Sequence, residues 1–169
     1  MLYAGTGSTQ PNRPGTFKLP GIGQGHQPGI TRALQAAGFS AAASHNYYQH
    51  ALVPSPSQPA FPLAELHQKT NPPGLQLALF EHDGLTVATA TLHRYENDQW
   101  QLWDLSVRAD RRRRGIASHL LAQCLHTALN HGAAGVFAYV SVDHHSGRRL
   151  LSKSGFTNVD TLTIYHRRP

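Results

Sequence analysis

The stretch LWDLSVRADRRRRGIASHLL, residues 102–121, joins a strand pattern, a dense run of arginines and the start of a helix. From Gly115 onward, apolar residues recur every three or four positions, which predicts a helix. The first turn of a helix carries unpaired N–H groups and the positive end of the helix dipole, so it favours an anion. Gly115 allows close approach to the backbone, and the arginines add charge-assisted hydrogen bonds. The stretch therefore predicts a phosphate or diphosphate site.

Other nucleotide-binding and nucleophile motifs are excluded. The sequence contains no G-x-x-x-x-G-K-[ST] motif, so it has no P-loop. The glycines of Gly21–Gly25 follow no strand pattern, which excludes a Rossmann fingerprint. No G-x-S-x-G motif supports a serine hydrolase.

The elements on either side of residues 102–121 come in a definite order. Asp83-Gly84 separates two apolar runs and predicts a hairpin turn, and a second turn is expected at Glu96–Asp98. The helix that follows Gly115 carries an apolar stripe from Ile116 to Leu129 and ends at Gly132. We expect strands at 75–82, 85–95, 100–107, 135–142 and 160–167, and a short helix at 147–154 before Gly155.

The segment Arg112-x-x-Gly115-x-Ala117 resembles the [RQ]-x-x-G-x-[GA] signature of the GCN5-related N-acetyltransferases, the GNAT superfamily. The order of elements is also similar to that family from about residue 60 to residue 169. Taken alone, the six-residue motif also fits a solvated arginine-rich loop before a helix. The resemblance implies a mixed α+β (α/β) fold of the acyl-CoA N-acyltransferase type. In this fold a twisted, mostly antiparallel sheet is flanked by helices on both faces.

The resemblance implies acetyl-CoA as co-substrate and direct acetyl transfer to a primary amine in a ternary complex, with no covalent enzyme intermediate. Backbone amides at the start of the helix would hold the diphosphate. The strand before the signature would splay from the next parallel strand and pair with the pantetheine arm. The Val107 N–H would then polarise the thioester carbonyl. The residues implied in cofactor binding are Leu105, Ser106, Val107, Arg112, Arg113, Arg114, Gly115, Ile116, Ala117 and Ser118.

The sequence departs from the family pattern at Leu151. Aligned on Gly155-Phe156, Leu151 stands where the family often has a tyrosine that protonates the departing CoA thiolate. Leucine cannot donate a proton. Another donor could substitute (Tyr139, His144, Tyr165 or water), or the protein could be weakly active or bind CoA without turnover.

The acceptor amine must lose a proton before attack, because an alkylammonium has a pKa near 10.4. A general base is therefore expected. Asp104 is the first candidate, and its alternative role is a carboxylate paired with an arginine. His93 and Glu96 are weaker candidates. The catalytic candidates that we retain are Asp104, His144 and Tyr139.

Several other side chains are given structural roles. Trp100 and Trp103 lie three positions apart on one strand, so one should be in the core and the other on a surface or cleft. Cys124 falls on the apolar stripe and is expected to be a buried hydrophobe. No metal site is expected, because no carboxylate or second thiol completes the polar helix face formed by His119, Gln123 and His126.

Residues 1–53 are expected to form an irregular N-terminal region, followed by the acetyltransferase domain at 54–169. The N-terminal region should contain a short helix at Ile30–Ala37 and a strand at Ser44–Val53 that supplies a missing edge strand to its own subunit or to a partner. A brief helix is expected at Leu63–Gln68. Residues 30–40 resemble residues 148–158, with Gly38-Phe39 and Gly155-Phe156 lying 117 positions apart. This echo is either chance or the tail of an earlier copy of the domain.

Composition limits the function classes. The chain has 169 residues and 18.5 kDa, about one domain, and Lys plus Arg number 15 against nine acidic residues. Five arginines in seven positions, 108–114, predict an anionic partner. No apolar run is long enough to span a membrane, no signal peptide is evident, and one cysteine cannot form an intrachain disulfide. A cytoplasmic location follows by default.

The expected partners are acetyl-CoA and a small-molecule or peptide amine, with no membrane and no nucleic acid, and a homodimer is left open. Two other function classes remain. The arginine block could bind nucleic acid, which predicts affinity that falls steeply with salt. Alternatively, the domain could be an inactive CoA-binding module. The acceptor cannot be inferred from the sequence.

Overall fold

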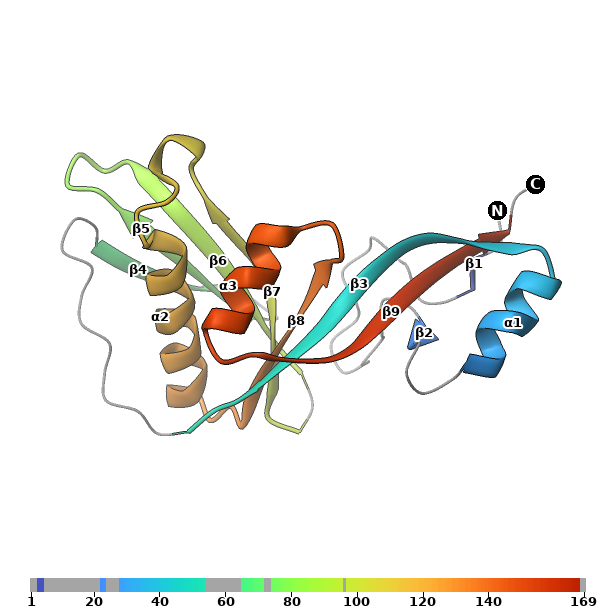
Figure 1. The fold of residues 1–169 in the computed structure, drawn as a ribbon. Helices are drawn as coiled ribbons and strands as arrows, with labels where there is room; N and C mark the ends of the chain where they lie inside the picture. Colours follow the sequence, from blue (N-terminus) through green and yellow to red (C-terminus); the bar gives the residue numbers. More distant parts are fainter. Residues whose placement is uncertain are drawn as a thin grey trace.

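The computed structural model describes residues 3–4, 22–23, 28–53, 65–71, 74–95 and 97–167. Within them the chain forms a mixed α+β fold around one mostly antiparallel sheet (Figure 1). The strands follow the order β1-β9-β3-β8-β7-β6-β5-β4, with β2 also paired to β9. Their bounds are β1 Tyr3–Ala4, β2 Ile22–Gly23, β3 Phe39–Ala51, β4 Glu65–Asn71, β5 Gly74–Phe80, β6 Thr86–Arg94, β7 Gln99–Val107, β8 Gly135–Ser141 and β9 Thr157–Arg167. The helices are α1 Pro28–Ala36, the 3₁₀ turn η1 Ala109–Arg111, α2 Ile116–Asn130 and α3 His145–Lys153.

The two sequence-predicted turns join neighbouring antiparallel strands. Gly84 adopts a left-handed φ of 81°, and the Leu85 N–H donates to the Asp83 carboxylate at 2.9 Å, which closes the β5–β6 hairpin. Asn97 and Asp98 also have positive φ, and they connect β6 to β7. Among the described strands, β7 and β8 are the one pair that runs in parallel, because α2 forms the crossover between them. The expected mixed, mostly antiparallel sheet is confirmed.

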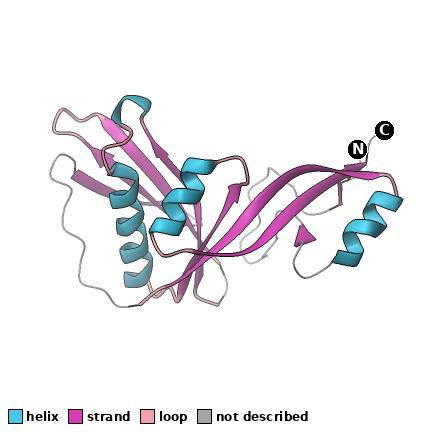
Figure 2. Cartoon of the chain, in the orientation of Figure 1, coloured by secondary structure: helices cyan, strands magenta, loops and turns pink. Residues whose placement is uncertain are grey.

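One hydrophobic core joins α2 to the sheet. The predicted stripe of α2 is buried at Ile116, Leu120, Leu121, Cys124 and Ala128. It packs with alternate residues of β5 and β6, which share a face because side chains alternate along a strand. Burial raises the pKa of the Cys124 thiol to about 12, as expected for an inert core residue. We expected helices on both faces of the sheet, whereas α2 and α3 lie over the same face (Figure 2).

Strand β3 corrects the predicted role of Ser44–Val53. The segment is a strand, but it lies between β8 and β9, paired on both sides, and is therefore not an edge strand. Past their pairing with β8, β3 and β9 continue as a long ribbon that extends away from α2 and reaches α1 (Figure 1), and the short strands β1 and β2 pair with β9 along it. Helix α1 and its end at Gly38, with φ of 81°, agree with the prediction.

The helix predicted at Leu63–Gln68 is wrong. Within it, residues 65–68 belong to β4, which pairs antiparallel with β5. The segment is mostly polar and has no clear period of its own, so backbone pairing with β5 decides its conformation. Of the helices in the described part of the chain, none has both the length and the apolar character needed to cross a bilayer.

Candidate active site

The site is built around a β-bulge in β7. The register with β6 jumps from Leu92 opposite Leu102 to Thr91 opposite Asp104, which leaves Trp103 as the extra residue. Parallel pairing with β8 also ends at Leu102, opposite Ala138. A bulge bends its strand and increases the local twist, so β7 diverges from β8 after this point. The second half of β7 is left with a free backbone edge toward β8 among the described residues.

The groups on this free edge follow from the antiparallel pattern. The Arg108 N–H donates to the Val87 carbonyl at 2.9 Å, so Arg108 and Ser106 direct their backbone groups toward β6. The intervening residues, Leu105 and Val107, direct theirs toward β8. The Arg112 side chain donates from Nε to the Val107 carbonyl at 3.1 Å. Since no strand among the described residues pairs with this edge after Leu102, the Val107 N–H is available there.

Helix α2 begins in a geometry suited to an anion. Gly115, its N-cap, has φ of 79° and supplies no side-chain cap to the helix. Among the described residues, the amides of residues 113–118 donate no backbone hydrogen bond outside the helix. A Cβ at Gly115 would meet nothing within 4 Å, so the approach to these amides is open. An open, uncapped helix start fits the diphosphate of CoA.

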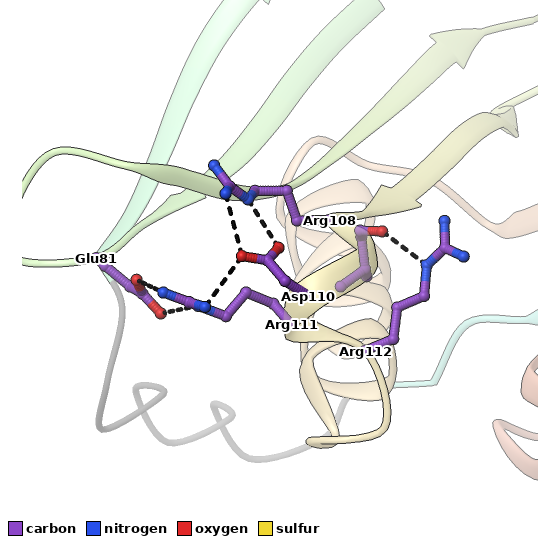
Figure 3. A network of polar contacts seen from close by, with 6 residues as sticks. Glu81, Arg108, Asp110, Arg111 and Arg112 are labelled. Atoms are coloured by element: carbon purple, nitrogen blue, oxygen red, sulfur yellow. Dashed lines mark hydrogen bonds and ion pairs between the residues drawn. The ribbon is translucent and has the colours of Figure 1, made fainter.

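The arginine run contains two groups: Arg108 and Arg111, whose ion pairs Figure 3 shows, and Arg113 and Arg114. Arg111 makes two hydrogen bonds to Glu81, of 2.8 and 3.0 Å, and Arg108 makes two to Asp110, of 2.9 and 3.1 Å. The Arg111 hydrogen bonds hold the pKa of the Glu81 carboxyl below its ordinary value. These pairs tie the loop to the β5–β6 turn. Sequence reasoning could not separate the two groups, because the Glu81 contact spans 30 positions.

Arg113 and Arg114 form the second group. Both are exposed, and neither makes an ion pair within the described part of the chain. Arg113 has a positive φ of 62°, which belongs to the tight turn that leads into α2. The two guanidinium groups adjacent to the helix start are therefore available for phosphate oxygens.

Two catalytic candidates flank the divergence of β7 and β8. Asp104 is exposed on β7 just after the bulge, and it pairs with no arginine among the described residues. Tyr139 follows Ala138, the last residue of β8 that pairs with β7. Its hydroxyl is buried without a hydrogen-bond partner among the described residues. Burial raises the pKa of Tyr139, so its hydroxyl stays protonated.

The other candidates lie in different surroundings. His144 is exposed at the N-cap of α3, and a Cβ on Gly147 would lie 2.8 Å from its Nδ1. Tyr165 lies in the outer ribbon, where its hydroxyl donates to Thr31 at 3.3 Å, so it is not brought to the site. Leu151 is 2% exposed within the core. Glu96 lies outside the described residues.

Sequence reasoning missed the aromatic side chains that meet near the divergence. Tyr47 of β3 stacks on Tyr139, with ring centroids 5.2 Å apart. His93 stacks on Trp103 at 5.1 Å, and Trp103 is 47% exposed whereas Trp100 is buried at 4%. The predicted division of the two tryptophans is confirmed. The tyrosine pair of residues 47–48 was the available signal, but nothing local shows which strand lies beside it.

The comparisons with known proteins agree with the fold. The family model described as "Acetyltransferase (GNAT) family" matches residues 32–156, well over half of the chain. The chain belongs to the GNAT acetyltransferase family. This family membership supports acyl transfer as the class of reaction, with acyl-CoA as the typical donor of such enzymes. No curated protein matches the chain.

Solved structures share the GNAT fold at low sequence identity. A GCN5-related N-acetyltransferase from Sphaerobacter thermophilus matches with a TM-score of 0.68 and 17% identity, over 86% of this chain and 57% of that one. One from Kribbella flavida matches with 0.66 and 15%, over 84% and 65%. A tandem GNAT protein from the clavulanic acid biosynthesis pathway matches with 0.70 and 12%, over 97% and 61%. The chain thus spans less than two thirds of the length of these structures.

Proposed function

We propose that the protein transfers an acetyl group from acetyl-CoA to a primary amine by direct attack in a ternary complex. The observation that carries this proposal is that residues 103–118 contain two sites with free backbone groups, one after the other. The first is the free edge of β7 after the bulge, and the second is the uncapped start of α2. An extended thiol arm and its diphosphate need these two sites in this order.

The residues divide the binding work. Leu105 and Val107 offer backbone groups to the arm, whereas the Ser106 backbone faces β6, so Ser106 is left at most a side-chain role. Arg112 braces the turn through the Val107 carbonyl. The amides of Arg113, Arg114, Gly115, Ile116, Ala117 and Ser118 bind the diphosphate, and the Arg113 and Arg114 guanidinium groups add charge. Exposed Ser118 and half-buried Ala117 keep the first turn narrow.

The reaction chemistry follows from the groups around the divergence. Bound acetyl-CoA supplies an activated thioester carbonyl, and the Val107 N–H is the donor placed to stabilise its oxygen. Asp104 accepts the proton of the acceptor ammonium, directly or through water. Tyr139 donates a hydrogen bond to the leaving sulfur. Its pKa lies above the ordinary thiol value of about 8.5, so the proton itself comes from His144 or water.

Leu151 favours a second candidate function, in which the protein binds CoA without catalysing transfer. The position is filled by an apolar core side chain that can donate no proton. A thiol-release assay across a panel of amines separates the two functions, because only an enzyme accelerates release in the presence of an amine.

Nucleic-acid binding is less well supported. Arg108 and Arg111 are already paired with Asp110 and Glu81, which reduces the free positive charge of the block. The cytoplasmic location, the homodimer and the division of the chain at residue 53 stay predictions.

The binding proposal is tested with two matched glycines. Gly115 and Gly132 have φ of 79° and 80°, and a Cβ at either meets nothing within 4 Å. Gly115→Glu and Gly132→Glu should therefore cost similar stability, about 1 kcal/mol each. Only Gly115→Glu places a carboxylate in the anion site, and it should weaken CoA binding at least about tenfold by calorimetry. Equal CoA affinity of the two variants would remove the proposed site.

A further inference from the structure

On the face of the sheet opposite α2, the stacked rings of Trp103 and His93 form a platform beside the proposed reaction centre. In a bulge, two consecutive residues of one strand oppose a single residue of its partner, so Trp103 and Asp104 lie side by side opposite Thr91. The ring of Trp103 contacts the ring of His93, so both side chains lie on the same face of the sheet. Within the described residues no helix covers this face, and Trp103 is 47% exposed.

The platform is flat and uncharged. The rings of Trp103 and His93 are stacked, with centroids 5.1 Å apart and planes inclined by 23°. Burial lowers the pKa of His93 below its ordinary value, so the imidazole is neutral at neutral pH. A neutral π-stack of this kind offers an uncharged face on which another flat ring can pack.

Aromatic rings also form the opposite wall of the divergence. Tyr47 and Tyr139 are stacked at 5.2 Å, and Phe137 meets both of them edge-on, at 6.0 and 5.7 Å. Tyr95 meets Phe137 at 5.3 Å. Phe137 and Tyr139 alternate with the core residues Val136 and Ala138, which places these rings on the face opposite α2.

One carboxylate lies beside the platform. Asp104 stands next to Trp103 and has no ion-pair partner in the described part of the chain. A single carboxylate balances one ammonium group. A polyamine would leave its further cations without a partner on these rings, although each ring face could hold one by a cation–π contact.

From this arrangement we propose that the acceptor is an arylalkylamine, with its ring on Trp103 and its amine directed to Asp104. The inference rests on the proposed function, because it assigns the acceptor of the same reaction. It makes Trp103 a specificity-determining residue and gives Asp104 the second task of orienting the ammonium group. Asp104 first accepts a proton from the ammonium group, which frees the nitrogen lone pair. The amine nitrogen then forms a bond to the acetyl carbonyl carbon as the carbon–sulfur bond breaks. The CoA thiolate leaves and takes up a proton from His144 or water, and water accepts the second proton that the nitrogen loses.

The experiment compares three monoamines, two with an aryl ring and one without, with one polyamine. Thiol release from acetyl-CoA is measured for tryptamine, 2-phenylethylamine, n-butylamine and spermidine with the full chain. Trp103→Ala is compared with Val159→Ala, a change at an apolar side chain that is 45% exposed on β9. We expect kcat/KM for the aryl amines to exceed that for butylamine by about tenfold or more, from ring stacking and apolar burial. Trp103→Ala should raise KM for the aryl amines with little change in kcat, and Trp103→Phe should restore part of the loss.

The outcomes separate the acceptor inference from the function. Acetylation of butylamine or spermidine at least as efficient as that of tryptamine overturns the inference and keeps the enzyme. The same holds if Trp103→Ala leaves the aryl preference unchanged. Release that no amine accelerates, in a protein that binds CoA by calorimetry, overturns the proposed transfer and the acceptor inference with it. Unchanged CoA affinity of Trp103→Ala shows that the variant is folded.

Discussion

Two units of the molecule have the same local structure and different surroundings. In one, α1 ends at Gly38 and leads into β3; in the other, α3 ends at Gly155 and leads into β9. Their glycines have φ of 81° and 84°. The hydrogen bonds that end the helices also correspond at an offset of 117 positions, because Gly38 N–H donates to Gln35 as Gly155 N–H does to Ser152.

The correspondence extends to the pairing of the two strands. Ala41 pairs with Tyr165, and moving each residue by 117 positions gives Tyr48 and Asn158, which also pair. The ribbon therefore has an approximate two-fold axis, at the pair of His45 with Leu162. The sequence echo thus has a structural counterpart. That it descends from an earlier copy of the domain stays a prediction.

The two units differ in what they pack against. Leu151 of α3 is buried in the core that α2 forms with the sheet, whereas the corresponding Leu34 of α1 is only half-buried. Helix α1 lies at the end of the ribbon remote from α2 (Figure 1). The local sequence sets the helix, its end and the strand, while burial depends on the neighbours that the fold supplies.

The largest expected loss of stability is at two leucines that correspond between the units, Leu151 and Leu34. Leu151→Ala should destabilise the protein by about 3 kcal/mol, because it leaves a cavity in the core, and Leu34→Ala by about 1 kcal/mol. Urea unfolding followed by circular dichroism measures both. Equal losses would mean that α1 is as firmly packed as α3, and the contrast between the units would disappear.

Alanine substitutions at Gly38 and Gly155 should differ less in their effect on stability. Alanine at either site is strained by about 1 kcal/mol in a left-handed conformation. At Gly155 the new Cβ would also lie 3.1 Å from the His50 ring, whereas at Gly38 the nearest atom is 4.0 Å away. Gly155→Ala should therefore cost about 1 kcal/mol more than Gly38→Ala in thermal unfolding. The reverse order would contradict this packing.

The smallest expected change is in the pH dependence of stability, and it comes from His45 at the two-fold axis of the ribbon. Burial lowers the pKa of His45 below its ordinary value of 6.5, so the folded protein binds its proton less readily than the unfolded chain. Stability from this group is complete above pH 6.5 and is lost as the pH falls through the folded pKa. His45→Leu, which copies Leu162, should flatten the fall in stability between pH 7.5 and 5.5. It should not abolish it, because burial also lowers the pKa of His93 and His119. An unchanged slope would exclude His45 as a contributor.

Local rules were sufficient for part of the fold. The α2 stripe, the Asp83-Gly84 turn and the helix ends at Gly38, Gly132 and Gly155 all follow from periodicity and backbone preference. The start of α2 was predicted for the same reason. These features depend on residues within a few positions of one another.

The remaining features depend on distant pairing. The place of β3 between β8 and β9 is set by contacts across about a hundred positions, which no local pattern specifies. The bulge at Trp103 has no glycine or other local signal. The sequence therefore predicted that one of the two tryptophans is exposed, but not that it is Trp103 or that Trp103 stacks on His93. For the same reason Tyr47 was missed as a neighbour of Tyr139.

The place of β3 between two strands that are synthesised much later affects how the chain folds during translation. Residues 39–51 emerge from the ribosome long before residues 135–141 and 157–167, their only partners among the described residues. During that interval both edges of a long strand rich in alanine and tyrosine lack a partner, a state that favours pairing with other nascent chains. Closure of so large a loop is slow, so β3 should pair only after β8 and β9 have been synthesised. A ribosome stalled before residue 135 should therefore hold a chain that depends on chaperones.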